Sequence, residues 1–127
     1  AHQLKDRVQA LSNVPMEDLA IIYQLAEIFC YPSIFEGFGI PIIEALFSKT
    51  PVISSQGSCF AEAGGTHSVY VNLQNAEKEI RKAIVSITTD EELRRQMVEE
   101  GYRHAQHFTD EAVFENLMKV YKKVKSE

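Results

Sequence analysis

The spacing of apolar residues divides the chain into short helices and strands that alternate. Apolar residues at 16, 19, 20, 23 and 26 repeat at helical spacing, which predicts a helix over Met16–Ala26. The continuous apolar run Ile28–Tyr31 predicts a buried strand of a parallel sheet. Pro51–Ser55 and Ser68–Val71 predict two more strands, and Val8–Leu11 is a candidate for a short one.

Helical patterns fill most of the remaining chain. One helix is expected over Ile40–Ser48, and Cys59–Ala63 predicts a short helical turn. Further helices are expected over Ala76–Thr88, from an Asp90 cap to Ala105, and from Thr109 onward. The last helix carries an apolar stripe of Val113, Phe114, Leu117, Met118, Tyr121 and Val124. This alternation predicts an α/β fold, a Rossmann-like parallel sheet flanked by helices, in a single domain over 1–127.

Composition narrows the class of protein. The chain has 127 residues, of which 45% are hydrophobic, enough for one modest core. Its net charge of −5 gives no electrostatic footprint for nucleic acid. Cys30 and Cys59 are not expected to pair, the histidines show no metal-ligand spacing, and no secretory or bilayer-spanning run is apparent. We therefore expect a cytoplasmic protein without a metal or other cofactor.

The stretch 32–46 joins a predicted strand to a predicted helix and contains two glycines. Gly39 allows a sharp backbone path, and Pro41 suits the first turn of a helix. Such a helix would direct its free amides, chiefly those of Gly39, Ile40 and Ile42, at the loop. The start of this helix is therefore a candidate site for an anion such as phosphate.

Two carboxylates frame this loop: Glu36 lies at its entry and Glu44 in the first turns of the helix. The helix dipole favours the ionised form of both, but two carboxylates beside a phosphate would repel it. As hydrogen-bond acceptors they suit hydroxyl groups instead. A ligand with both phosphate and hydroxyls, such as a sugar nucleotide, fits this combination. The alternative is an ordinary strand-to-helix turn with two solvated acids.

The motif P-S-x-x-E-G-F-G-I-P-x-x-E-A-L resembles the donor-site signature of retaining glycosyltransferases with the GT-B fold, and most closely glycosyltransferase family 4 (group 1). The segments N-V-P-x-E-D-L, P-V-I-S-S and H-F-T-D-E-A also resemble this family. The resemblance implies that the chain is the later part of the C-terminal, donor-binding half of such an enzyme. It implies transfer of a hexose from a UDP- or GDP-linked sugar to a glycan or a lipid-linked acceptor, without a metal at the diphosphate.

The resemblance also implies roles for individual residues. Glu36 would contact the transferred sugar at the reaction centre, without being assigned as acid, base or nucleophile. Phe38 would lie against the donor, and the amides of Gly39 and Ile40 would bind its sugar or distal phosphate. Glu44 would bind the ribose hydroxyls. The plainer alternatives are a helix-capping acid for Glu36, core packing for Phe38, turn geometry for the two amides and an ordinary helix acid for Glu44.

Three residues outside the motif have weaker claims to the site. Asn13 and Val14 would border the base, although a turn role suits them equally. Glu62 would lie near the sugar or would cap a short helix. Because ligands bind beyond the carboxyl ends of parallel strands, the loop after Ser55 is expected beside the loop after Tyr31.

The sequence departs from the family pattern in two places and lacks one part of it. Thr50 stands where the family usually has glycine, and a tryptophan common near Thr109 is absent. The family's Arg and Lys for the diphosphate, and its N-terminal Rossmann-like domain, would lie upstream. The chain alone would then be inactive, and its last helix would fold onto its own sheet or self-associate. Contact of the whole protein with the inner membrane face is a further expectation.

Two other functions fit the same sequence. A non-catalytic Rossmann-like module that kept the loop would bind a partner rather than transfer sugar. A GT-B sugar-nucleotide epimerase or phosphorylase would need other catalytic residues upstream.

Overall fold

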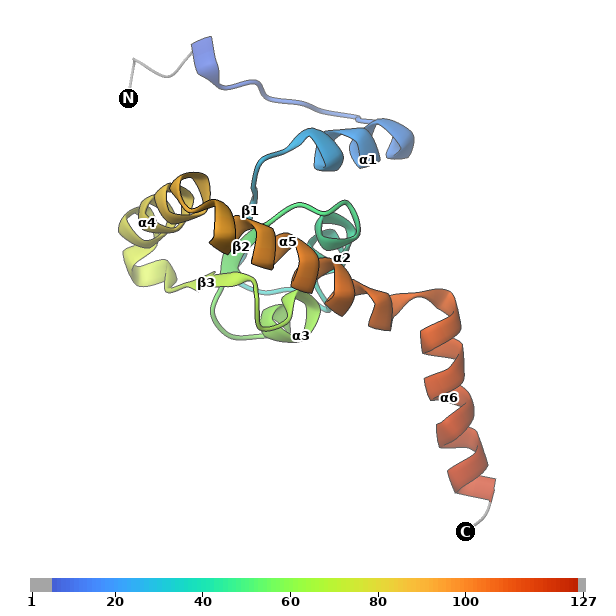
Figure 1. Ribbon diagram of the computed structural model, residues 1–127. Helices are drawn as coiled ribbons and strands as arrows, with labels where there is room; N and C mark the ends of the chain where they lie inside the picture. The colour runs from blue at the N-terminus through green and yellow to red at the C-terminus, as the bar shows by residue number, and fades with distance from the viewer. Residues whose placement is uncertain (1–5, 126–127) are drawn as a thin grey trace.

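The computed structural model describes residues 6–125 and is built on a three-stranded parallel sheet (Figure 1). The strands are β1 (Phe29–Tyr31), β2 (Val52–Ser55) and β3 (Val69–Val71), in the order β1-β2-β3. Register places Cys30 beside Ile53, and Ile53 beside Val69. The predicted α/β fold with a parallel sheet flanked by helices is confirmed.

Helices connect the strands and extend beyond them. They are α1 (Met16–Leu25), α2 (Ile40–Phe47), α3 (Phe60–Gly64), α4 (Ala76–Thr89), α5 (Glu91–Ala105) and α6 (Asp110–Lys125). Single 3₁₀ turns precede α4 at Leu73–Asn75 and follow α5 at Gln106–Phe108. As predicted, Asp90 caps α5 by accepting a hydrogen bond from the Leu93 amide at 2.9 Å.

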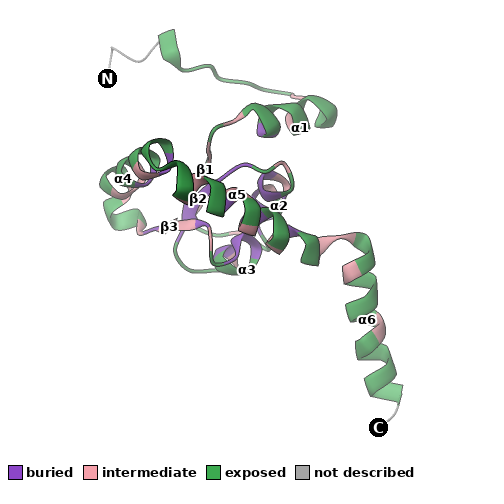
Figure 2. Cartoon of the chain, in the orientation of Figure 1, coloured by how far each residue is buried: buried purple, intermediate pink, exposed green. Residues whose placement is uncertain are grey.

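Each face of the sheet packs against a separate cluster of buried residues. Phe29, Tyr31 and Val52 pack with α1, α2 and α3, where the most deeply buried side chains include Ile42 and Phe60. The other face packs against α4 and the first half of α5 through Ile53, Val69, Val71, Ala83, Ile87 and Met97. In Figure 2 the buried residues gather around the sheet, α2 and α3. The larger of the two clusters of buried residues therefore includes α2 and α3, next to the loop that carries the motif.

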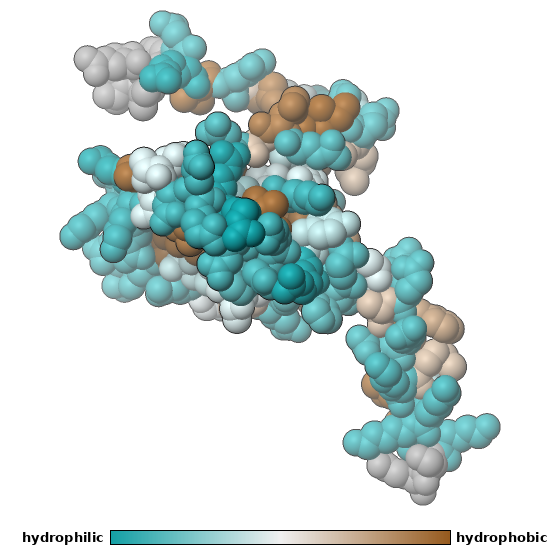
Figure 3. All heavy atoms as spheres, viewed as in Figure 1, coloured by the Kyte–Doolittle hydropathy of each residue, from teal (hydrophilic) through white to brown (hydrophobic). Residues whose placement is uncertain are grey.

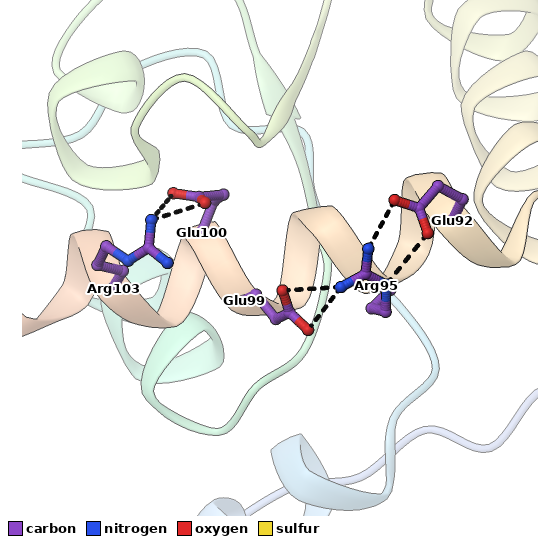
Figure 4. A network of polar contacts seen from close by, with 5 residues as sticks. All are labelled: Glu92, Arg95, Glu99, Glu100 and Arg103. Atoms are coloured by element: carbon purple, nitrogen blue, oxygen red, sulfur yellow. Dashed lines mark hydrogen bonds and ion pairs between the residues drawn. The ribbon is translucent and has the colours of Figure 1, made fainter.

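Helix α5 joins both parts of the core. Its second half approaches α2 so closely that a Cβ on Gly101 would lie 2.7 Å from a methyl carbon of Leu46. The outward face carries ion pairs of Arg95 with Glu92 and Glu99, and of Arg103 with Glu100 (Figure 4). Such exposed pairs add little stability. They do engage the side chains of Arg95 and Arg103, in a chain whose net charge is −5.

The expected strand at Val8–Leu11 is wrong. Val8 and Leu11 are 71% and 56% exposed, and no strand of the described residues lies beside this segment. A run this short acquires strand structure only by pairing. The apolar pattern alone could not supply the neighbour.

The prediction of a strand at Ile28–Tyr31 is confirmed for Phe29–Tyr31, but the prediction that this strand is buried is wrong. Only Phe29–Tyr31 is extended, Phe29 and Tyr31 are half-buried, and Cys30 is exposed. Register shows the cause: Cys30 shares a sheet face with Ile53, and the helices that cover Ile53 do not extend over β1. Cys30 is therefore exposed on this face, and β1 is an edge strand of the described sheet because it pairs with β2 alone.

Helix α6 projects away from the rest of the molecule (Figure 1). It contains no buried residue, and its apolar stripe is largely exposed in Figure 2. The expectation that this helix folds onto its own sheet is therefore wrong. A second exposed apolar surface covers α1 and includes Met16, Ile21 and Leu25 (Figure 3).

Candidate functional site

The loops that follow β1 and β2 meet at the carboxyl edge of the sheet. Tyr31 and Ser54 pair at the ends of their strands. Beyond them, the Ser58 hydroxyl and the Cys59 thiol each donate to the Glu36 carbonyl at 3.4 Å. The structure therefore brings the two loops side by side, as the sequence predicted.

Gly39 forms the entry to α2 and has no substitute there. Its φ is 92°, in the left-handed region, and an added Cβ would lie 3.2 Å from the Ala63 Cβ. The expectation of a free Ile42 amide is wrong, because this amide donates to the Gly39 carbonyl at 2.9 Å. The amides of Gly39 and Ile40 have no backbone acceptor within residues 6–125. Two unpaired donors therefore remain at the start of the helix.

Glu36 is held by two hydroxyl groups. Its Oε1 accepts a hydrogen bond from the Tyr31 hydroxyl at 2.5 Å and another from the Ser33 hydroxyl at 2.9 Å. The bond from Tyr31, and then that from Ser33, lowers the pKa of the Glu36 carboxyl below its ordinary value. The N-cap of α2 is Gly39 and has no side-chain cap, so Glu36 does not cap this helix. Glu36 is thus an ionised acceptor with a fixed orientation.

Glu44 lies in the second turn of α2, half-buried against α1. Its Oε2 accepts a hydrogen bond from the Tyr23 hydroxyl at 3.2 Å. Burial, and then the charge of Glu44, raises the pKa of Tyr23 to about 12. Because the dipole acts mainly within the first turn of a helix, Tyr23 rather than the dipole is the main local partner of Glu44. The carboxylate lines a groove of about 210 Å³ between α1 and α2, together with Met16, Leu19, Ala20, Tyr23, Phe47 and Ser48.

Phe38 packs within the protein as well as facing solvent. Its ring meets the ring of Phe108 edge to face, with 5.6 Å between centroids, and the residue is 39% exposed. This contact ties the loop to the turn before α6. A donor contact by Phe38 remains a prediction.

The three weaker candidates are not joined to the motif by any contact described within residues 6–125. Asn13 is exposed and adopts a left-handed turn with φ 55°, and Val14 is half-buried. The Glu62 side chain is exposed, while its carbonyl lies 2.9 Å from His104 Nε2. These positions favour a turn for Asn13 and leave the base and sugar contacts as predictions.

No Lys or Arg side chain of the described residues forms an ion pair with Glu36 or Glu44. Arg95 and Arg103 are paired with glutamates, and the Lys49 ammonium lies over the Tyr102 ring, 5.1 Å from its centroid. Within the same part of the chain, no three metal-ligating side chains gather. The site as described offers two amides and two carboxylates.

The hydroxyl partners of the two carboxylates, Tyr23, Tyr31 and Ser33, were not among the predicted site residues. Tyr23 and Tyr31 were interpreted as core residues because they occupy apolar positions of a helix and a strand. Ser33 carried no signal beyond its place in the motif. A tyrosine at a buried position usually needs a partner for its hydroxyl, which is the signal that was available.

Ser54 and Ser55 are adjacent in β2, and their hydroxyl groups differ in hydrogen bonding. Replacing each with alanine therefore tests the hydrogen bonds at the carboxyl edge of the sheet. The Ser54 hydroxyl donates to the Tyr31 carbonyl at 3.0 Å, whereas the buried Ser55 hydroxyl has no partner within residues 6–125. We expect Ser54→Ala to lower the free energy of unfolding by about 1 kcal/mol and Ser55→Ala to raise it by about 1 kcal/mol. Urea unfolding measures both. Equal losses would show that the Ser55 hydroxyl has a partner.

The chain is similar in sequence to known glycosyltransferases. The sequence profile described as "Glycosyl transferases group 1" matches residues 1–104. The O-antigen chain mannosyltransferase RfbU of Salmonella typhimurium is 46% identical over 85 residues, which are 67% of this chain and 24% of that protein. O-antigen chain mannosyltransferase B of Escherichia coli is 30% identical over 115 residues, 91% of this chain and 30% of that protein.

A solved structure is similar along nearly the whole chain. Sucrose-phosphate synthase from Thermosynechococcus elongatus matches with a TM-score of 0.82 and 28% identity, over 97% of this chain and 31% of that one. The matched part of the chain thus covers from 24% to 31% of the length of these proteins. No helix within residues 6–125 is both long and apolar enough to cross a membrane.

Proposed function

The chain belongs to the group 1 glycosyl transferases, which have the GT-B fold, and we propose that it forms the donor-binding part of a retaining glycosyltransferase of family 4. The observation that carries the proposal is the arrangement of the two motif carboxylates. Glu36 and Glu44 flank the start of α2, each held by a tyrosine hydroxyl, and two unpaired amides lie between them in the sequence. This arrangement suits a ligand that carries hydroxyls on both sides of a phosphate.

The proposed ligand is a nucleotide-diphosphate sugar linked to UDP or GDP. The amides of Gly39 and Ile40 bind a phosphate or sugar oxygen, Glu44 accepts from the ribose hydroxyls and Glu36 accepts from the transferred sugar. Two relatives are named as mannosyltransferases, which favours mannose as the transferred hexose. The acceptor is a glycan or a lipid-linked glycan.

The proposal includes partners beyond this chain. The charge of a diphosphate leaving group needs cations, and the described site supplies none. We propose that an upstream Rossmann-like domain supplies them and the acceptor site, and that α6 contacts this domain or a second copy of the chain. The proposed location is cytoplasmic, with contact to the inner membrane face as an alternative.

Glu44→Ala tests the nucleotide site. We expect the free energy of UDP or GDP binding to weaken by about 1.5–3 kcal/mol, the range for hydrogen bonds to a charged group. Titration followed by NMR measures this in the complete protein, with Glu99→Ala on the exposed face of α5 as a control. Unchanged affinity in Glu44→Ala would contradict the ribose assignment. Failure of the complete protein, with its proposed upstream domain, to bind either nucleotide would favour a non-catalytic module.

A further inference from the structure

We propose that Tyr23 and Tyr31 are positioning residues that fix Glu44 and Glu36 as a pair of oriented acceptors. The expected effect on ligand binding rests on the proposed function, since the ligand is the nucleotide sugar of the same site. The hydrogen bonds and ring contacts that restrain the two carboxylates are all between described residues.

Both tyrosines make the same kind of contact with their carboxylate. The Tyr31 hydroxyl donates to Glu36 Oε1 at 2.5 Å, and the Tyr23 hydroxyl donates to Glu44 Oε2 at 3.2 Å. In each case the other carboxylate oxygen has no partner within residues 6–125. Each tyrosine therefore restrains one oxygen and leaves the second available to a ligand hydroxyl.

The two tyrosines share a half-buried aromatic neighbour, Phe29. The Phe29 ring meets the Tyr23 ring edge to face at 5.1 Å and stacks on the Tyr31 ring at 5.6 Å with 15° between the planes. Rings in such contacts have few alternative positions in a packed core. The path Glu44–Tyr23–Phe29–Tyr31–Glu36 thus connects the two acceptors through side chains as well as through the loop.

The backbone of each tyrosine is fixed in the same way. The Thr50 hydroxyl donates to the Tyr23 carbonyl at 2.6 Å, and the Ser54 hydroxyl donates to the Tyr31 carbonyl at 3.0 Å. Both donors come from the segment that enters and forms β2. This also gives Thr50 a role at a position where the family usually has glycine. Each tyrosine is restrained at its backbone and at its hydroxyl.

Restrained acceptors matter because a ligand then meets them in a single geometry. A carboxylate that must be ordered on binding loses side-chain entropy, whereas one that is already ordered does not. The hydrogen bond from Tyr31 also lowers the pKa of Glu36, so the acceptor is ionised as well as oriented. Tyr23→Phe and Tyr31→Phe would remove the restraint without removing the ring.

The first test needs no ligand. Three-bond NMR couplings report whether the Glu χ1 angles occupy one rotamer, and carboxyl ¹³C shifts report the Glu36 pKa. We expect Tyr31→Phe to average the Glu36 couplings and raise its pKa, and Tyr23→Phe to average those of Glu44. The control is Tyr70→Phe, because the Tyr70 hydroxyl donates only to backbone carbonyls, those of Phe60 and Gly65. Unchanged couplings in both glutamates would overturn the proposal.

The second test separates positioning from the proposed function. In a double-mutant cycle with UDP and GDP as probes, we expect Tyr23→Phe to weaken binding about threefold to tenfold, the effect of one hydrogen bond. In the Glu44→Ala background, which removes the acceptor of the Tyr23 hydroxyl, the same change should have less than about a twofold effect, because the two residues act together. Equal losses in both backgrounds would overturn the positioning role. If Glu44→Ala itself binds normally, the ribose assignment fails, and the couplings alone decide the role of Tyr23.

Discussion

Replacing Glu36 with glutamine is expected to lower the proposed sugar transfer, measured in the complete protein with its proposed upstream domain, about 10²- to 10³-fold, the usual effect of removing one preorganised electrostatic group. Glutamine keeps the shape of the side chain, and its amide oxygen still accepts from Tyr31 and Ser33. What is lost is the negative charge, which the pKa of Glu36 shows to be stabilised in this loop. The loss should therefore appear in transfer rather than in folding.

The measurement is kcat with saturating donor, together with the unfolding midpoint of each variant. Glu99→Gln, on the exposed face of α5, is a matched control that removes the same charge away from the loop. The kcat of Tyr31→Phe should lie between those of Glu36→Gln and Glu99→Gln, since this change frees the Glu36 carboxylate without neutralising it. Normal transfer by Glu36→Gln would remove this residue from the reaction centre.

Much of the fold was predictable because its signals are local. Apolar spacing found α1, α2, α4, α5 and α6 to within one or two residues. The Asp90 cap was predictable because a side-chain oxygen placed just before a helix satisfies one of its free amides. Alternation of helices and strands then restricts the sheet to parallel pairing with crossovers.

The errors concern neighbours that a local pattern does not contain. The run at Ile28–Tyr31 has the composition of a buried strand, but burial of Cys30 needs a helix over that face of β1. The stripe on α6 correctly predicts a helix with an apolar face and says nothing of what covers it. Periodicity identifies the face of an element, whereas the partner is a tertiary property.

The candidate site also has features that were predictable from the local sequence and features that depend on distant neighbours. Gly39 and the start of α2 were predictable, since glycine and proline act on their own backbone. The partner of Glu44 was not, because Tyr23 lies 21 residues away in the sequence and on another helix. The Ile42 amide was assigned wrongly because the first turn of α2 closes onto the Gly39 carbonyl. Local geometry of this kind depends on how the loop approaches the helix.

The chain of residues 1–127 on its own is expected to transfer no sugar and to bind UDP or GDP no better than about 1 mM, which corresponds to about 4 kcal/mol. The amides at the start of α2 and the two carboxylates are present, so part of a donor site forms. The described site has no cation for the diphosphate and only one of the two proposed domains. Positioning of both reactants contributes about 7–11 kcal/mol to lowering a barrier, and this contribution would be absent.

Calorimetric or NMR titration with both nucleotides, followed by a transfer assay with several donors, measures these expectations. Weak binding that disappears in Glu44→Ala would show that the partial site is the one described. Micromolar binding would mean that cations within this chain, such as Lys49 or the paired arginines of α5, reach the diphosphate after rearrangement. Sugar transfer by the chain alone would contradict the need for an upstream domain. The first result would place the nucleotide on α2, because Glu44 is the carboxylate that this helix contributes.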